Sequence, residues 1–185
     1  FQKRSKYQRA LEYYGRGISI LTSQPVLDET NTALAYGNAG SCLAEMSRFD
    51  SAFLYLEKAL EITENKDKLL SQRVRVYDFI SKTHNLKGDF KKGVSYSHKA
   101  LKLILSHVPH DKRNLLSIYN NLGVGYSDLG EDARAITYYQ KAIKGVVELL
   151  GDKHYFLIRL YNNLGVSYKK LGEPEKAVDY HSLAL

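Results

Sequence analysis

The stretch YNNLGVGY at residues 119–126 returns as YNNLGVSY at residues 161–168, 42 residues further along the chain. A glycine that follows the first copy, Gly130, has counterparts 42 residues away on either side, at Gly88 and Gly172. Alanines keep the same spacing, at steps of 41, 42 and 42 residues: Ala59, Ala100, Ala142 and Ala184. Internal similarity at a fixed period of this length is typical of solenoids, which stack one small structural unit many times.

Each unit is expected to contain two helices joined by a tight turn. In the first helix, one face carries residues at the i, i+3, i+4 and i+7 spacing: Tyr119, Leu122, Gly123 and Tyr126. Gly130 is a helix-stop signal, and the second helix carries small and aromatic residues on one face: Ala135, Tyr139 and Ala142. Glycine inside a helix costs about 1 kcal/mol relative to alanine. Gly123 and Gly165 therefore predict a close approach of the paired helix, which we place at Ala135 and Ala177.

The spacing Tyr-x-x-Leu-Gly-x-x-Tyr, then Gly, then Ala-x-x-x-Tyr-x-x-Ala resembles the tetratricopeptide repeat. The usual leading tryptophan is replaced by tyrosine in each unit: Tyr36, Tyr77, Tyr119 and Tyr161. The 42-residue period and the segment LGDKH at 150–154 resemble the kinesin-light-chain type of this repeat. The resemblance implies an all-α fold, a right-handed superhelical solenoid of antiparallel helix pairs. It also implies a scaffold that binds a protein or peptide in its concave groove, and not an enzyme.

The 42-residue register divides residues 1–185 into about four and a half repeats within one domain. A partial repeat is expected at 1–24, followed by repeats at about 28–65, 67–108, 111–150 and 153–185. Both ends of the sequence cut through a repeat. We therefore expect a fragment of a larger protein, with this segment as its sensory or interaction part in signalling or regulation.

The third repeat departs most from the pattern. Ile80-Ser81 replaces Leu-Gly, His84 stands where the later repeats have tyrosine, and Gly93 stands where they have alanine. The sequence leaves two interpretations open, a looser repeat or one modified for a contact.

The net charge of +7 raises the question of nucleic acid. Lysine and arginine are interspersed with acidic residues along most of the chain, so the surplus is weak support for such a partner. An RNA-binding helical solenoid is kept as an alternative, and self-association through the terminal repeats is another. No apolar run is long enough for membrane insertion by this segment. The single cysteine, Cys42, excludes an intrachain disulfide and is interpreted as a small buried residue.

First helices are expected to line the inner wall of the superhelix, where residues just off the packing face point into the groove. These are the candidate peptide-binding residues: Asn38, Arg75, Phe79, Lys82, Asn120, Asn121, Val124, Arg159, Asn162, Asn163, Val166 and Lys170. Asn38, Asn121 and Asn163 occupy equivalent positions, and an amide can donate to and accept from a peptide backbone at once. We therefore consider a ladder of asparagines that holds an extended chain, which Phe79 interrupts. The alternative is that these amides bond locally within the hairpin.

Catalytic and metal sites have little support. The local histidine cluster, His107 and His110, has two residues in an expected loop, with no further ligand at motif spacing. Phosphate-binding, metalloprotease and serine-hydrolase motifs are absent from the sequence. We expect no catalytic residues, no metal and no cofactor.

Overall fold

The computed structural model describes residues 2–185, with side chains from residue 4 onward. The described residues form nine α-helices and one short 3-10 helix at Asp67–Leu69. The α-helices are α1 (Gln2–Thr22), α2 (Glu29–Glu45), α3 (Phe49–Thr63), α4 (Leu70–Lys87), α5 (Phe90–His107), α6 (Lys112–Asp128), α7 (Asp132–Leu150), α8 (Phe156–Lys170) and α9 (Pro174–Leu183).

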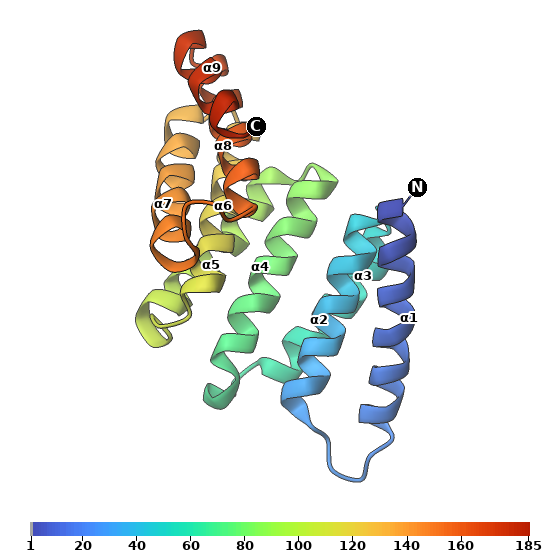
Figure 1. Cartoon of the computed structure of the whole chain (residues 1–185). Coiled ribbons are helices and arrows are strands. Elements are labelled where there is room, and N and C mark those ends of the chain that lie inside the picture. The colour runs from blue at the N-terminus through green and yellow to red at the C-terminus, as the bar shows by residue number, and fades with distance from the viewer. Residues whose placement is uncertain (1) are drawn as a thin grey trace.

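The helices stack in chain order from α1 at one end to α9 at the other (Figure 1). Four hairpins follow α1, namely α2/α3, α4/α5, α6/α7 and α8/α9. The first helices of successive hairpins also contact each other, α2 with α4, α4 with α6, and α6 with α8. They therefore form the inner wall of the curve. The predicted fold class, an all-α right-handed solenoid of antiparallel helix pairs with about four and a half repeats, is confirmed.

The turn inside each hairpin has the same backbone geometry. Gly130 has φ +80°, in the left-handed region, and Glu131 N donates to Tyr126 O at 2.8 Å. This pair of features ends α6 as a Schellman motif does. The turn recurs at Gly88 and Gly172, while Ser47 adopts the same conformation in the first complete hairpin at φ +60°. A regular turn lets each second helix fold back against its own first helix.

Close packing within a hairpin occurs at a different residue from the one predicted. A Cβ built on Gly123 would lie 2.4 Å from Cε1 of Tyr139, and one on Gly165 would lie 2.8 Å from Cε1 of His181. The predicted contact at Ala135 and Ala177 was therefore wrong in detail. The missing side chain makes room for a ring one turn further along the second helix. In the first complete hairpin the corresponding contact joins Gly40 to Leu56.

The third repeat replaces this contact with hydrogen bonds. Ser81 Oγ lies 2.6 Å from Ser97 Oγ and donates to Gly93 O at 2.8 Å. Asn85 occupies the space above Gly93, where a Cβ would lie 1.9 Å from its Oδ1, and donates to Asn121 O at 3.0 Å. Gly93 and Asn85 therefore depend on each other. Gly93 leaves room for the side chain of Asn85, and Asn85 in turn bonds to the next repeat.

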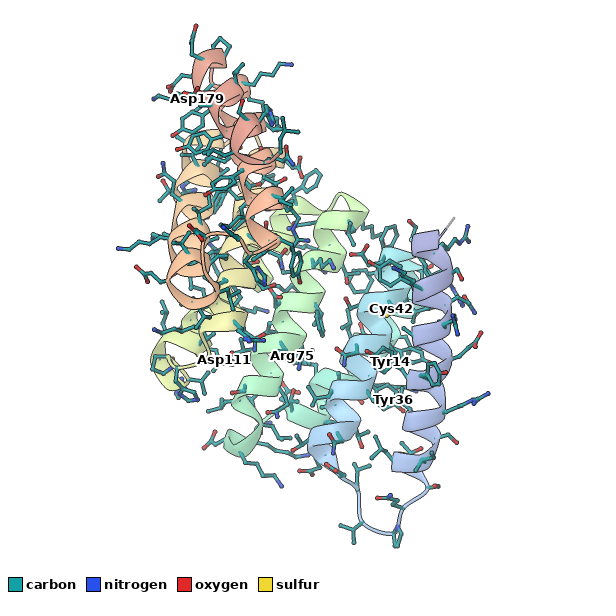
Figure 2. All side chains as sticks on the ribbon, in the orientation of Figure 1. Tyr14, Tyr36, Cys42, Arg75, Asp111 and Asp179 are labelled. Carbon is teal, nitrogen blue, oxygen red and sulfur yellow. The ribbon has the colours of Figure 1, made fainter. Side chains whose placement is uncertain are left out.

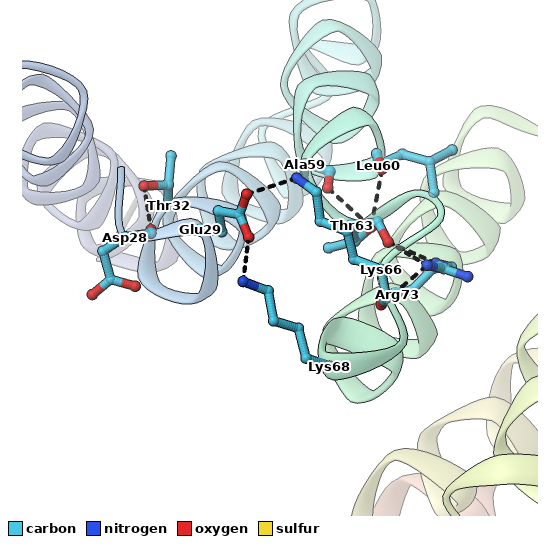
Figure 3. A network of polar contacts seen from close by, with 9 residues as sticks. All are labelled: Asp28, Glu29, Thr32, Ala59, Leu60, Thr63, Lys66, Lys68 and Arg73. Carbon is cyan, nitrogen blue, oxygen red and sulfur yellow. Dashed lines mark hydrogen bonds and ion pairs between the residues drawn. The ribbon is translucent and has the colours of Figure 1, made fainter. Parts of the chain in front are cut away.

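The junction between α3 and α4 is held by charged residues (Figure 3). Lys66 Nζ donates to Glu29 Oε1 at 2.9 Å and Lys68 Nζ forms an ion pair with Oε2 at 2.9 Å, and the two lysines lower the pKa of that carboxyl. Arg73 Nε donates to Thr63 O at 2.9 Å and so covers the end of α3. These contacts fix the position of the second hairpin relative to the first.

Cys42 is half-buried, not fully buried, and burial raises the pKa of its thiol. In the described part of the chain, no helix combines the length and the apolar character that crossing a bilayer requires.

We expect Gly123→Ala to lower the free energy of unfolding by about 1–3 kcal/mol, because its methyl group would overlap the Tyr139 ring. The matched control is Gly15→Ala on α1, where no atom lies within 4 Å of an added Cβ. That change should be neutral or stabilise by up to about 1 kcal/mol. Chemical denaturation of the two variants and the parent chain measures both values. Equal effects in the two variants would contradict the packing role of Gly123.

Candidate functional site

The inner wall contains a hollow of about 550 Å³ between α2, α4 and α6, called here the central hollow. It is lined by Leu34, Ser71, Gln72, Arg75, Asp78, Phe79, Asp111, Arg113, Asn114 and Ser117. Figure 2 labels two of these residues, Arg75 on α4 and Asp111 immediately before α6. The central hollow combines an arginine pair, an aromatic ring and several amide and hydroxyl groups, which are suited to a polar ligand with some apolar surface.

Arg75 is held in place by its neighbours. Its guanidinium carbon lies 5.6 Å from the centroid of the Phe79 ring, one helical turn further along α4. Its Nη2 donates to Asn38 Oδ1 at 3.2 Å, so it also links α4 to α2. A guanidinium has several N–H donors in a planar fork that matches a carboxylate. Arg75 therefore presents an oriented cation to the hollow.

Asp78 lines the same hollow and is 4% exposed. Its Oδ2 accepts from Ser117 Oγ at 2.6 Å and its Oδ1 accepts from Asn121 Nδ2 at 2.7 Å. Burial raises the pKa of Asp78 to about 6, although these hydrogen bonds and the charges of Lys82 and Arg75 act in the opposite direction. This carboxyl joins α4 to α6 and places a titratable group in the groove wall.

A second hollow of about 300 Å³, the C-terminal hollow, lies between α6 and α8. It shares Arg113 and Ser117 with the central hollow, so the two adjoin. Arg159 lines it, with its guanidinium carbon 4.6 Å from the centroid of the Phe156 ring. The joined hollows thus carry arginine beside phenylalanine at two places along the inner wall, with Arg113 between them.

Of the residues that the sequence singled out, Arg75, Phe79 and Arg159 line these hollows. The asparagines are engaged between neighbouring repeats. Asn121 donates to Asp78, and at the equivalent position Asn163 Nδ2 donates to Asn120 Oδ1 at 3.4 Å. The local bonding considered for these amides therefore runs between hairpins, not within one. Their role in peptide binding remains a proposal.

Most of the remaining candidates contact other residues of the chain. Lys82 forms an ion pair with Glu45 at 2.6 Å, and Lys170 Nζ donates to Ser127 O at 2.9 Å. Asn120 is buried, whereas Asn162 is exposed and its Oδ1 lies 3.2 Å from His181 Nδ1. Val124 is half-buried against the main core and Val166 is 44% exposed. These six do not line either hollow.

The two hollows also have lining residues that the sequence did not single out. They are Leu34, Ser71, Gln72, Asp111, Arg113, Asn114, Leu116, Leu150, His154, Tyr155 and Phe156. The sequence contains a signal for Arg113, because steps of four residues lead from the candidate Asn121 back to Ser117 and then to Arg113, on one side of the helix. Among the described residues, no group of three or more His, Cys, Asp or Glu side chains is arranged to hold a metal ion.

Comparison with known proteins identifies the repeat. The family model described as tetratricopeptide repeat matches residues 1–65 and 114–185, which together exceed half of the chain. Residues between these segments include the polar third repeat. Mouse (Mus musculus) sperm-associated antigen 1 is 31% identical over 110 residues, which make up 58% of this chain and 11% of that protein. The chain thus spans about a tenth of this relative.

Solved structures share the fold at low sequence identity. The Rap conjugation gene regulator of plasmid pLS20, in complex with the Phr* peptide, superposes with a TM-score of 0.82 at 20% identity, over 97% of this chain and 48% of that one. The kinesin-light-chain-like repeats from Podosopora anserina give a TM-score of 0.69 at 13% identity, over 100% of this chain and 88% of that one. The predicted long-repeat family resemblance is confirmed.

We expect stability to depend on pH through Asp78. Its pKa is raised in the fold, from 3.8 to about 6. Its contribution is therefore fully present below about pH 4 and is lost as the pH rises through about 6. Asp78→Asn, which introduces the residue found at the equivalent positions 120 and 162, removes this dependence. The variant should be as stable as the parent at pH 4 and more stable at pH 8 by up to about 3 kcal/mol.

Chemical denaturation across this pH range measures the difference. The control is Asp179→Asn, because Asp179 is exposed on α9 (Figure 2). A pH profile that Asp78→Asn leaves unchanged would contradict the assignment.

Proposed function

Since the chain belongs to the tetratricopeptide-repeat family, we propose that it binds an acidic peptide in extended form along its inner wall. The observation that carries this proposal is the pair of adjoining hollows, each with an arginine against a phenylalanine ring. The proposed role is binding and not catalysis.

The chemistry of the hollows favours a peptide with carboxylates and apolar side chains. Arginine pairs with a carboxylate through two parallel hydrogen bonds, and its charge is retained at any physiological pH. Phe79 and Phe156 offer apolar surface beside these cations. Packed helices lie about 8–10 Å apart, which is about three residues of extended chain. Carboxylates a few residues apart in one strand could therefore meet Arg75, Arg113 and Arg159 together.

The comparisons support one part of the proposal, that the chain binds a peptide. The Rap regulator, which shares this fold, was solved with a bound peptide. This chain spans 48% of that protein. We therefore also propose that this chain is the sensory or interaction part of a larger signalling or regulatory protein.

RNA binding is the rival function. It requires a continuous positive strip, whereas Asp78 and Asp111 line the central hollow among the arginines. Binding driven by phosphates also weakens steeply with salt and depends little on the base sequence of the nucleic acid. A protein ligand fits the mixed lining better.

The proposal is tested with a labelled eight-residue peptide that has glutamate at every third position and leucine between, and its counterpart with lysine in place of glutamate. We expect an affinity in the micromolar range for the acidic peptide, about −8 kcal/mol. Replacing Arg75, Arg113 and Arg159 by glutamine should weaken it at least about tenfold, since each charged hydrogen bond contributes about 1.5–3 kcal/mol. Fluorescence anisotropy measures both affinities.

The matched control replaces Arg4, Arg9 and Arg16, which are exposed on α1, and removes the same three charges. Similar losses in the two triple variants would indicate attraction by net charge alone and contradict the proposed site. Equal affinity for the lysine peptide, or displacement of the acidic peptide by single-stranded RNA, would also contradict it.

A further inference from the structure

A third cavity lies outside the two hollows of the inner wall, between α6 and α7. This side pocket has a volume of about 360 Å³ and opens where α6 begins and α7 approaches its end. Leu116 separates it from the C-terminal hollow, because this side chain lines both. Its other walls come from Pro109, the first two turns of α6 and the last turns of α7. A ligand could therefore occupy it independently of a peptide on the inner wall.

The side pocket coincides with a break in the repeat pattern. Gly145 lines it, and the equivalent positions in the two preceding repeats hold Leu103 and Ile62, at steps of 42 and 41 residues. Glycine inside a helix costs about 1 kcal/mol relative to alanine, and α7 continues to Leu150. Leu116 packs onto the bare backbone, since a Cβ on Gly145 would lie 2.4 Å from its Cδ2. The missing side chain at Gly145 thus makes room for Leu116, and these two residues together form part of the pocket wall.

The lining of the side pocket is amphipathic. Leu115, Leu116, Tyr119 and Leu149 supply apolar walls. Three lysines surround them, Lys112, Lys141 and Lys144, against a single carboxylate, Glu148, which lies 4.0 Å from Lys144. Lys141 Nζ lies 5.9 Å from the centroid of the Tyr119 ring, so its charge is positioned over one wall. The walls are thus complementary to a molecule with one apolar tail and one negative head group.

From this geometry we propose that the side pocket binds a small amphipathic anion, a medium-chain acyl carboxylate. Its volume lies at the lower end of the range for small-molecule sites, which is about 300–1,000 Å³. The tail packs against the leucines and Tyr119, and the carboxylate lies among the three lysines. Each methylene that leaves water contributes to binding, so affinity rises with chain length until the pocket is full.

The test uses decanoate below its micelle concentration, with decanol and decyltrimethylammonium as probes of the same tail and a different head group. Titration of the ¹⁵N-labelled chain, followed by NMR, reports both the location and the affinity. We expect shifts centred on the amides of Gly145, Leu116 and Leu149. Decanoate should bind at least about tenfold more tightly than either other probe.

Two pairs of lysines provide a matched comparison. Lys141→Gln/Lys144→Gln removes two charges from the side pocket, and we expect decanoate affinity to fall about tenfold. Lys99→Gln/Lys102→Gln removes the equivalent charges from the third repeat, where Leu103 stands in place of Gly145, and should leave affinity within about twofold. Gly145→Leu, checked for folding by circular dichroism, should abolish the shifts. If that variant does not fold, the lysine pairs decide.

Other results overturn the proposal. Equal binding of the three probes would show a purely apolar surface, and equal effects of the two lysine pairs would show attraction by net charge. Shifts confined to the inner wall would assign the anion to the hollows. If only an acidic peptide, and not decanoate, shifts Gly145, the side pocket is a protein-docking surface instead. Because these arms do not involve Arg75, Arg113 or Arg159, they are independent of the proposed peptide site.

Discussion

Each hairpin depends on one close contact between a small residue of its first helix and a side chain of its second. The contact occupies equivalent positions in all four hairpins, as Gly40 with Leu56, Ser81 with Ser97, Gly123 with Tyr139, and Gly165 with His181. Core packing tolerates little change in volume, so this contact fixes how closely the paired helices approach. The Schellman turn that follows sets their relative direction. Together these two local features make every unit nearly alike, and stacking of like units produces the curve.

The inner wall then results from contacts between units. Asn121 donates to Asp78, Asn163 donates to Asn120, and Phe79 lies 3.4 Å from the Cβ position of Gly37. Phe79, Asn121 and Asn163 occupy equivalent positions in their first helices. Each of them contacts a residue of the preceding repeat that lies one position before its own equivalent there. These side chains set the spacing of the first helices, and the hollows lie in the turn before them. The binding surface that we propose is therefore a consequence of how the repeats are joined.

The fold could be predicted from the sequence because its determinants are local and recur every 42 residues. Glycine inside a helix correctly indicated a close approach, but it did not identify the partner, because Ala135 and Tyr139 share one helical face. The asparagines were noticed for a sound reason, since amides in a helix require partners, yet the partner lay in the neighbouring repeat. Arg113 and Gly145 were missed because they do not recur, and a pattern that identifies repeats obscures the residues that differ. The raised pKa of Asp78 follows from burial between two helices, which no spacing reveals.

The two hollows are the basis on which we propose ligand binding along the inner wall, on α4, α6 and the start of α8. Hydrogen–deuterium exchange of the chain with and without a saturating acidic peptide tests this assignment most directly, because it reports location without any substitution. We expect slower exchange in residues 70–80 of α4, 112–118 of α6 and 156–160 of α8, with little change in α5 and α7. Protection confined to α5 and α7, or spread evenly along the chain, would contradict it.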